Sequence, residues 1–196
     1  MRSEGPDAVS DASLRIVRIG AGENSAMTSQ TFSIRAIDPG VPAELDFVGD
    51  RMRRTLVEVD GERGGALYTP EWLRERAAFH LDASRCTGAV FVAVDAGGAL
   101  VGHTIVRVET HPDGRRFGLF ATTWVEPQLR RAGVADALLA RGEAWMLAHA
   151  LSEAATWTSA TNEKLIRLYA KHGYAQSDSG PEELTGAPMV RLSRRL

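Results

Sequence analysis

The stretch Arg130-Arg131-Ala132-Gly133-Val134-Ala135 follows an apolar, β-prone run at 117–125 and opens a segment with apolar residues at helical spacing. The first backbone N–H groups of a helix have no partner within the helix, and the helix dipole places partial positive charge at that end. Gly133 and Ala135 are small enough to let an anion approach these groups, and Arg130 and Arg131 add full positive charges. Positive side chains at a helix N-terminus are unfavourable unless an anion is present. The stretch therefore predicts a site for a phosphate or diphosphate.

The composition is ordinary for one globular domain. The chain has 196 residues, of which 44% are hydrophobic and 24% are charged. Its net charge of −2 gives no sign of a partner such as nucleic acid or a membrane surface. The single cysteine, Cys86, rules out an internal disulfide and is expected to be a half-buried thiol in a reducing compartment. The sequence shows no signal peptide, no membrane-spanning run and no metal-ligand spacing, so we expect a cytoplasmic protein without a metal.

Residues 1–30 are rich in Ser, Gly, Ala, Asp and Glu and are expected to form a flexible extension, which leaves 31–196 as a single domain. Alternating and β-branched runs predict strands at 31–37, 89–94, 100–108, 117–125, 154–159, 174–177 and 189–193. Apolar residues at steps of three and four, with capping signals, predict helices at 43–59, 69–81, 131–150 and 162–172. The glycine-rich segment 61–68 is expected to be a mobile loop.

A second motif occupies 162–174, with the sequence Asn-Glu-Lys-Leu-Ile-Arg-Leu-Tyr-Ala-Lys-His-Gly-Tyr. Asn162 is suited to cap a helix, and Gly173 is suited to end it before a strand that starts at Tyr174.

The pattern Arg-x-x-Gly-x-Ala, behind a strand that ends Val-x-Pro, resembles the acyl-CoA-binding motif of the GNAT superfamily of N-acetyltransferases. The second motif resembles a later motif of the same family, in which an Asn opens a helix and a Leu-Tyr pair lies near its end. The resemblance covers about residues 31–195. It implies an α/β (α+β) fold with a mixed, mostly antiparallel sheet of about six or seven strands and about four helices. It also implies direct transfer of an acetyl group from acetyl-CoA to a primary amine in a ternary complex.

The resemblance further implies which residues meet the cofactor. The main chain at Trp124 and Val125 would pair with the pantetheine arm, and the stretch 130–135 would hold the diphosphate. Asn162 either caps its helix or also reaches the cofactor, and the two roles are compatible. Tyr169 either fills the core with its ring or acts as the general acid that protonates the leaving thiolate.

The family gives no single position for the base that takes the amine's proton. Glu126, just past the strand, is ranked first and Glu109, at the end of the preceding strand, second. His103 lies inside that preceding strand and is expected to be a structural histidine. Thr122 and Thr123 could instead orient a water molecule.

The acceptor is expected to be a small-molecule or peptide amine. Glu62, Glu182 and Glu183 flank the segments that frame the acceptor site in this fold and slightly favour a cationic amine. A homodimer is expected by analogy alone. Two alternatives stay open: a non-catalytic acyl-CoA sensor or interaction module, and a site for another phosphate ligand such as a nucleotide. The missing Gly-x-x-x-x-Gly-Lys-Ser/Thr pattern argues against a P-loop.

Overall fold

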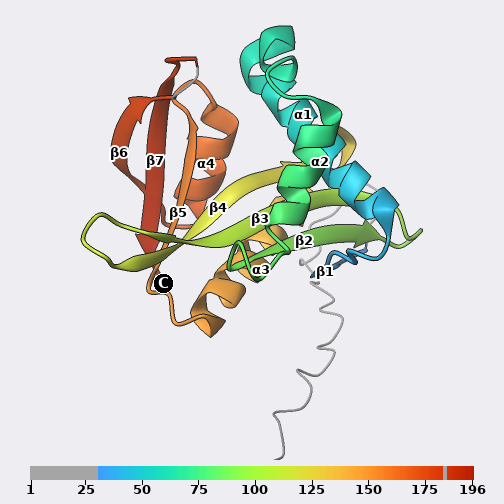
Figure 1. Ribbon diagram of the computed structural model, residues 1–196, viewed down its shortest axis with the longest axis horizontal. Helices are drawn as coiled ribbons and strands as arrows, with labels where there is room; N and C mark the ends of the chain where they lie inside the picture. The colour runs from blue at the N-terminus through green and yellow to red at the C-terminus, as the bar shows by residue number, and fades with distance from the viewer. Residues whose placement is uncertain (1–30, 183–184) are drawn as a thin grey trace, which may run out of the picture.

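The computed structural model describes residues 31–182 and 185–196, so the predicted extension 1–30 lies outside the described residues. One seven-stranded sheet with the order β1-β2-β3-β4-β5-β7-β6 forms the centre of the molecule (Figure 1). The strands are β1 (Phe32–Ala36), β2 (Gly88–Asp95), β3 (Leu100–Thr110), β4 (Arg116–Val125), β5 (Glu153–Ser159), β6 (Ala175–Pro181) and β7 (Pro188–Arg195). Only β4 and β5 run parallel, and all other neighbours are antiparallel.

The described chain also contains four α-helices: α1 (Pro42–Gly65), α2 (Pro70–Phe79), α3 (Val134–Ala148) and α4 (Glu163–Lys171). A short 3₁₀ helix, η1 (Pro127–Leu129), follows β4. The sequence-based prediction of a mixed, mostly antiparallel sheet with about four helices is confirmed. No helix in the described part of the chain has the length and apolar character needed to cross a membrane.

The loop expected at 61–68 is partly wrong, because α1 continues to Gly65. Gly61 interrupts the helix with φ 66° and ψ −159°, a conformation that a residue with a Cβ adopts only under strain. The expected start of α2 is confirmed, since the Thr69 hydroxyl accepts a hydrogen bond from the Trp72 N–H at 3.2 Å.

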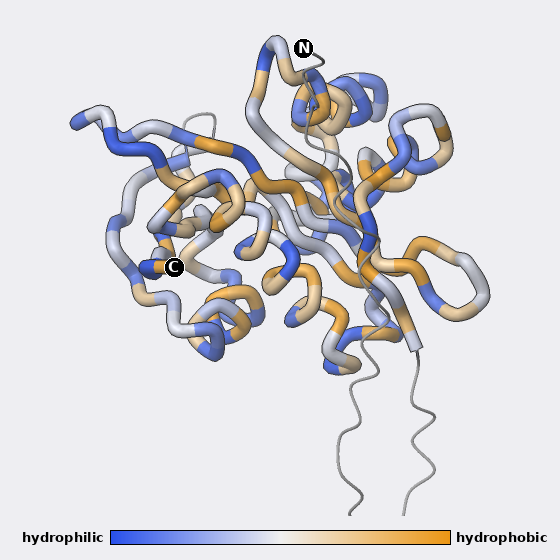
Figure 2. The backbone as a smooth tube through the Cα atoms, turned by 90° about the horizontal axis from the view of Figure 1, so that it is seen from below, coloured by the Kyte–Doolittle hydropathy of each residue, from blue (hydrophilic) through white to orange (hydrophobic). Residues whose placement is uncertain are grey.

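Two hydrophobic clusters lie on opposite faces of the sheet. On one face, Val48 of α1 and Ala77 of α2 pack against β2 and against Ile105 of β3. On the other, α3 and α4 cover a larger cluster that includes Val106, Phe120 and Tyr169. Hydrophobic segments concentrate in the central strands, while hydrophilic stretches lie mainly at the periphery (Figure 2).

Gly142 explains how closely α3 approaches the sheet. A Cβ at this position would lie 2.3 Å from Cε1 of Phe120. A glycine inside a helix costs about 1 kcal/mol relative to alanine, and here the close contact with the sheet accounts for it.

Candidate active site

The parallel pair β4 and β5 separates partway along its length. Their register joins 118–120 of β4 to 154–156 of β5 and goes no further. Beyond this point β4 continues to Val125 beside β3 alone, and the two strands diverge in Figure 1. The split coincides with a β-bulge at Ala121, because Ile105 of β3 pairs with Thr122 and Val106 pairs with Phe120.

The divergence leaves one backbone edge of β4 open to an extended ligand, which could add to the sheet as a strand does. Trp124 and Val125 lie on this edge, while their side chains are buried. The main chain of Trp124 and Val125 therefore lies at the open edge of β4, the edge that the resemblance predicts for the pantetheine arm. Contact with a pantetheine arm stays a prediction.

The loop after β4 leads into α3 through a backbone of alternating conformation. The left-handed residues Arg131 (φ 70°) and Gly133 (φ 85°) alternate with ordinary ones before α3 begins at Val134. The first hydrogen bond of α3 runs from the Ala137 N–H to the Gly133 carbonyl at 3.0 Å. Within residues 31–182 and 185–196, the amides of 133–136 have no acceptor and no capping side chain. This geometry suits an anion.

The helix starts three residues later than the expected 131, because the turn at 131–133 is not helical. The two arginines of this turn differ in their surroundings. Nε of Arg130 donates to the Val125 carbonyl at 3.0 Å, and its guanidinium meets Glu58 of α1 at 2.6 Å. Arg131 is exposed and has no ion pair with any described residue. Arg130 thus fastens the loop to β4 and α1, and Arg131 is the arginine whose charge is available to a ligand.

Tyr169 of α4 is 1% exposed, and its ring packs edge-on against Phe120 and Tyr174 at centroid distances of 5.8 and 4.8 Å. Burial raises the pKa of Tyr169, and hydrogen bonding with Thr123 and Thr156 opposes that rise. Thr156 belongs to the last residue pair between β4 and β5. The core-filling role is therefore confirmed, and the hydroxyl lies at the point of the split, protonated at neutral pH.

Asn162 caps α4 and connects it to β5. Its Oδ1 accepts from the Leu165 N–H at 3.3 Å, and its Nδ2 donates to Oγ1 of Thr158 at 3.2 Å. The predicted cap is confirmed. Contact with a cofactor stays a prediction.

The two candidate bases each have an arginine partner. Glu126 is 9% exposed, and its Oε1 accepts from Nε of Arg51 at 2.8 Å and from a second nitrogen of the same guanidinium. Glu109 Oε1 lies 2.6 Å from Nε of Arg107. Neither carboxylate is free, so a base role for Glu126 or Glu109 requires the remaining oxygen to receive the proton, directly or through water.

Several polar groups lie buried beneath α1. His103 is 0% exposed, and burial, followed by the charge of Arg51, lowers its pKa to about 3, so its imidazole is neutral. Both its ring nitrogens, Oγ1 of Thr122 and Nε1 of Trp124 lack a hydrogen-bond partner in the described structure. Thr123 instead meets Thr104 at 2.8 Å between hydroxyl oxygens. The sequence favoured a hydrogen-bonded core or surface histidine; His103 is in the core, but its ring nitrogens have no partner among the described residues.

Sequence reasoning missed Arg51 and Glu58, which both come from α1. Arg51 meets Glu126 across 75 residues, and Glu58 meets Arg130 across 72. No local sequence pattern predicts either ion pair. The available signal was the presence of charged residues on a long predicted helix.

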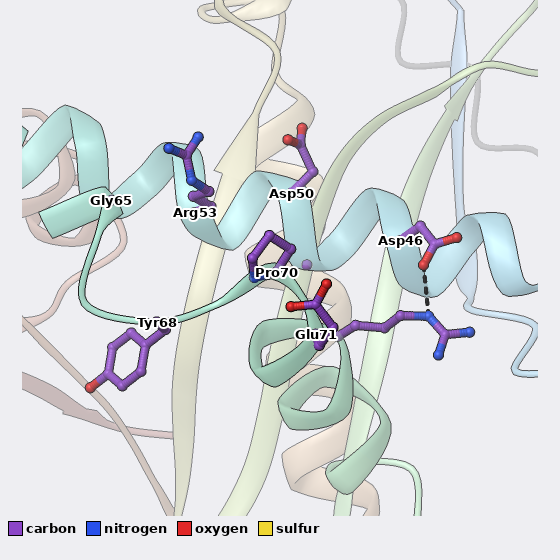
Figure 3. Close-up of a pocket in the computed structure, with 9 residues that line it drawn as sticks. Asp46, Asp50, Arg53, Gly65, Tyr68, Pro70 and Glu71 are labelled. Carbon is purple, nitrogen blue, oxygen red and sulfur yellow. Dashed lines mark hydrogen bonds and ion pairs between the residues drawn. The ribbon is translucent and has the colours of Figure 1, made fainter. Parts of the chain in front are cut away.

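A cavity of about 550 Å³ lies between α1 and α2 (Figure 3), and its lining residue Asp50 forms an ion pair with Arg51. Asp46, Asp50 and Glu71 line it together with Arg53, and Arg74 lies 2.6 Å from Asp46. None of the predicted cofactor residues borders this cavity. Among the described residues, no group of three or more side chains could hold a metal ion.

A divided sheet with a helix start suited to an anion at its opening fits an acyl-CoA-dependent acyltransferase. The chain belongs to the acetyltransferase (GNAT) family, whose model matches residues 53–174. The family uses acetyl-CoA as its acyl donor. No curated protein sequence matches the chain significantly.

Solved structures share the fold at low sequence identity. A GNAT-family acetyltransferase from Streptococcus pneumoniae superposes with a TM-score of 0.62 at 19% identity, covering 84% of this chain and 99% of the other. A spermidine N-acetyltransferase from Vibrio cholerae gives a TM-score of 0.62 at 17% identity, with coverage of 84% and 93%. The NatC complex bound to Gag peptide and CoA gives a TM-score of 0.63 at 18% identity, with coverage of 84% and 98%.

Proposed function

We propose that this enzyme transfers an acetyl group directly from acetyl-CoA to a primary amine in a ternary complex. The observation that carries the proposal is the divided sheet. The open edge of β4 ends at a loop whose free amides can take a diphosphate, and the hydroxyl of Tyr169 lies at the point of the split. One extended thioester ligand would satisfy all three features together.

The chemistry needs one bond to form and one to break. The amine nitrogen attacks the thioester carbonyl, the carbon–sulfur bond breaks, and the amine gives up a proton. Tyr169 donates its proton to the sulfur as negative charge develops there, which is the role of a general acid. A raised pKa keeps the phenol protonated until that moment. Glu126 is the first candidate to receive the amine's proton, through water at the oxygen that Arg51 leaves free.

One comparison supports a small-molecule or peptide amine as the acceptor. Proteins of the same fold include a spermidine N-acetyltransferase and a complex bound to a peptide.

The first experiment measures the melting temperature with and without acetyl-CoA. At 100 times the dissociation constant, binding stabilises by about 2.7 kcal/mol, which corresponds to a rise of roughly 5–10 °C for a chain of this size. Gly133→Trp should abolish the rise, because the new side chain would occupy the anion loop. Gly98→Trp is the matched control. Gly98 also has positive φ (84°) and open space around it, but lies in the β2–β3 turn.

Acetylated product is then measured by mass spectrometry for a set of amines. Product in the wild type and its loss in Gly133→Trp support the transferase. A melting shift without product for any amine would favour the acyl-CoA sensor. The absence of a shift in folded protein would contradict the cofactor assignment.

A further inference from the structure

A second cavity of about 550 Å³ lies where the end of α2 meets the start of β2 and the far part of β3. Its lining is dominated by guanidinium groups. Arg76 comes from α2, Arg85 from the loop that follows, Arg107 from β3 and Arg116 from β4. We call this cavity the arginine pocket.

Three of the four arginine side chains contact other side chains of the protein. The guanidinium carbons of Arg76 and Arg85 lie 4.7 and 4.9 Å from the ring centre of Phe79. Nε of Arg107 lies 2.6 Å from Oε1 of Glu109, close enough for an ion pair but not aligned as a hydrogen bond. The positions of these charges are therefore set before any ligand arrives.

Positive charge in the pocket exceeds negative charge. Four arginines line it, and Glu109 is its lining carboxylate. Asp82 lies near Arg85, but its carboxylate already accepts two hydrogen bonds from Ser84 at 3.0 and 2.6 Å.

The excess of positive charge also acts on neighbouring groups. Burial, followed by the charge of Arg107, lowers the pKa of Arg76. Burial, then Arg107 and Arg76, lowers the pKa of the adjacent His80 to about 3. Like charges placed this close cost free energy, and an anion would remove that cost.

The pocket opens on the same face of the sheet as α1 and α2. Ile105 packs under these helices, and side chains alternate along β3, so Arg107 shares that face. Arg107 pairs with Leu119, which pairs with Ala155, one residue before the last pair of β4 and β5. Neighbouring strands lie about 4.8 Å apart, so the Cα of Arg107 lies about one strand spacing from Leu119, while Glu109 and Arg116 lie further from the split.

We propose that the arginine pocket binds a carboxylate or phosphate group, and that the acceptor amine carries this group at the end away from its amine. The second part rests on the proposed function. The amine would reach the thioester at the split while its anionic group lies against Arg76 and Arg107. A polyamine would instead bring a second positive charge to four arginines. The arginine pocket thus opposes the slight preference for a cationic amine that the glutamates suggested.

Anion binding can be tested without any turnover. Cys86 is the single cysteine of the chain and lines the pocket, so its alkylation by iodoacetamide reports on this place alone. Succinate or inorganic phosphate, added at constant ionic strength against sodium chloride, should slow the alkylation several-fold. The slowing should vanish in Arg107→Gln and in Arg76→Gln, and should persist in Arg167→Gln, an exposed arginine on α4. Slowing by only one of the two anions would identify the group that the pocket takes. Unchanged rates in the folded wild type would overturn the anion site.

The acceptor class is tested with three amines of equal length: 6-aminohexanoate, hexylamine and 1,6-diaminohexane. With saturating acetyl-CoA, we expect kcat/KM for 6-aminohexanoate to exceed that for hexylamine by about ten- to a hundredfold, the usual value of charged hydrogen bonds. The higher kcat/KM for 6-aminohexanoate should result from a lower KM, and it should be lost in Arg76→Gln and Arg107→Gln. In the same variants, kcat/KM for hexylamine should not fall.

Each part can fail separately. A preference for the diamine, or variants that slow all three amines equally, would overturn the assignment of the acceptor. Protection of Cys86 without acetylation of any amine would keep the anion site and remove the proposed function. Acetylation of the amines with no preference for 6-aminohexanoate and no protection of Cys86 would keep the proposed function and overturn the anion site.

Discussion

Tyr169 is the residue on which the proposed chemistry depends most. Tyr169→Phe keeps the ring contacts with Phe120 and Tyr174 and removes only the hydroxyl at the split. We expect kcat to fall by about 10²–10⁴-fold, the usual contribution of a proton donor, while the dissociation constant of acetyl-CoA and the melting temperature change little. Steady-state kinetics and calorimetry measure these quantities. A kcat within threefold of the wild type would show that the leaving thiolate needs no donor here.

His103 makes stability depend on pH in a calculable direction. Its pKa is about 3 in the folded state, against about 6.5 in an unfolded chain. Between these values the unfolded chain binds a proton that the folded protein does not, so stability falls as pH falls. The fall is about 1.4 kcal/mol per pH unit for each such histidine. His80, with a pKa also near 3, adds a second contribution.

Urea unfolding at several pH values between 7.5 and 4.5 checks this prediction. His103→Leu should flatten the slope by about 1.4 kcal/mol per pH unit, and His80→Leu should do the same. If both variants keep the wild-type slope of stability against pH, groups other than these two histidines cause the loss of stability in acid.

At the scale of the element, substitutions of Asn162 at the start of α4 can distinguish helix capping from cofactor binding. Asn162→Ala should cost about 1 kcal/mol of stability and lower the melting temperature by roughly 2–4 °C, because the Leu165 N–H loses its acceptor. Asn162→Ser restores a capping oxygen and should recover that stability. If Asn162 also meets the cofactor, both variants weaken acetyl-CoA binding in calorimetry. If it only caps the helix, Asn162→Ser binds as the wild type does.

The elements nearest the motifs were the best predicted from sequence. The strand before Arg130, the cap at Asn162 and the end of α4 at Gly173 depend on neighbours within a few residues, and the structure places them as expected. The prediction of a loop at residues 61–65 was wrong, because a short glycine-rich segment can still be helical when one residue, Gly61, takes up the non-helical conformation. The separation of β4 from β5 follows from a bulge and a register, which no local pattern encodes.

The ion pairs of the candidate site could not be predicted either. Arg51 with Glu126, and Glu58 with Arg130, form only after α1 packs across the sheet. The arginine pocket likewise collects residues from α2, a loop, β3 and β4. Sequence spacing shows which charges exist, whereas the pairing of charges depends on the tertiary fold.

At the scale of the whole molecule, the sheet consists of two halves that meet at only three residue pairs, 118–120 with 154–156. β1 to β4 form one half with α1 and α2, and β5 to β7 form the other with α4 (Figure 1). A ligand seated in the split would contact both halves and oppose their separation, since local openings are suppressed by anything that binds only the closed state.

Hydrogen–deuterium exchange should therefore show slower exchange at 121–125 and 133–136, and also in α4, when acetyl-CoA is added to the intact protein. The amides of 133–136 should respond most strongly, because they have no acceptor within the described structure and would gain one from the diphosphate. α2 carries none of the predicted cofactor residues and should exchange at an unchanged rate, which makes it the internal control. Gly133→Trp should remove the effect in both halves at once, since a ligand that cannot anchor its diphosphate cannot hold the halves together. Protection confined to α1 and α2 would place the ligand outside the split and contradict the proposed cofactor site.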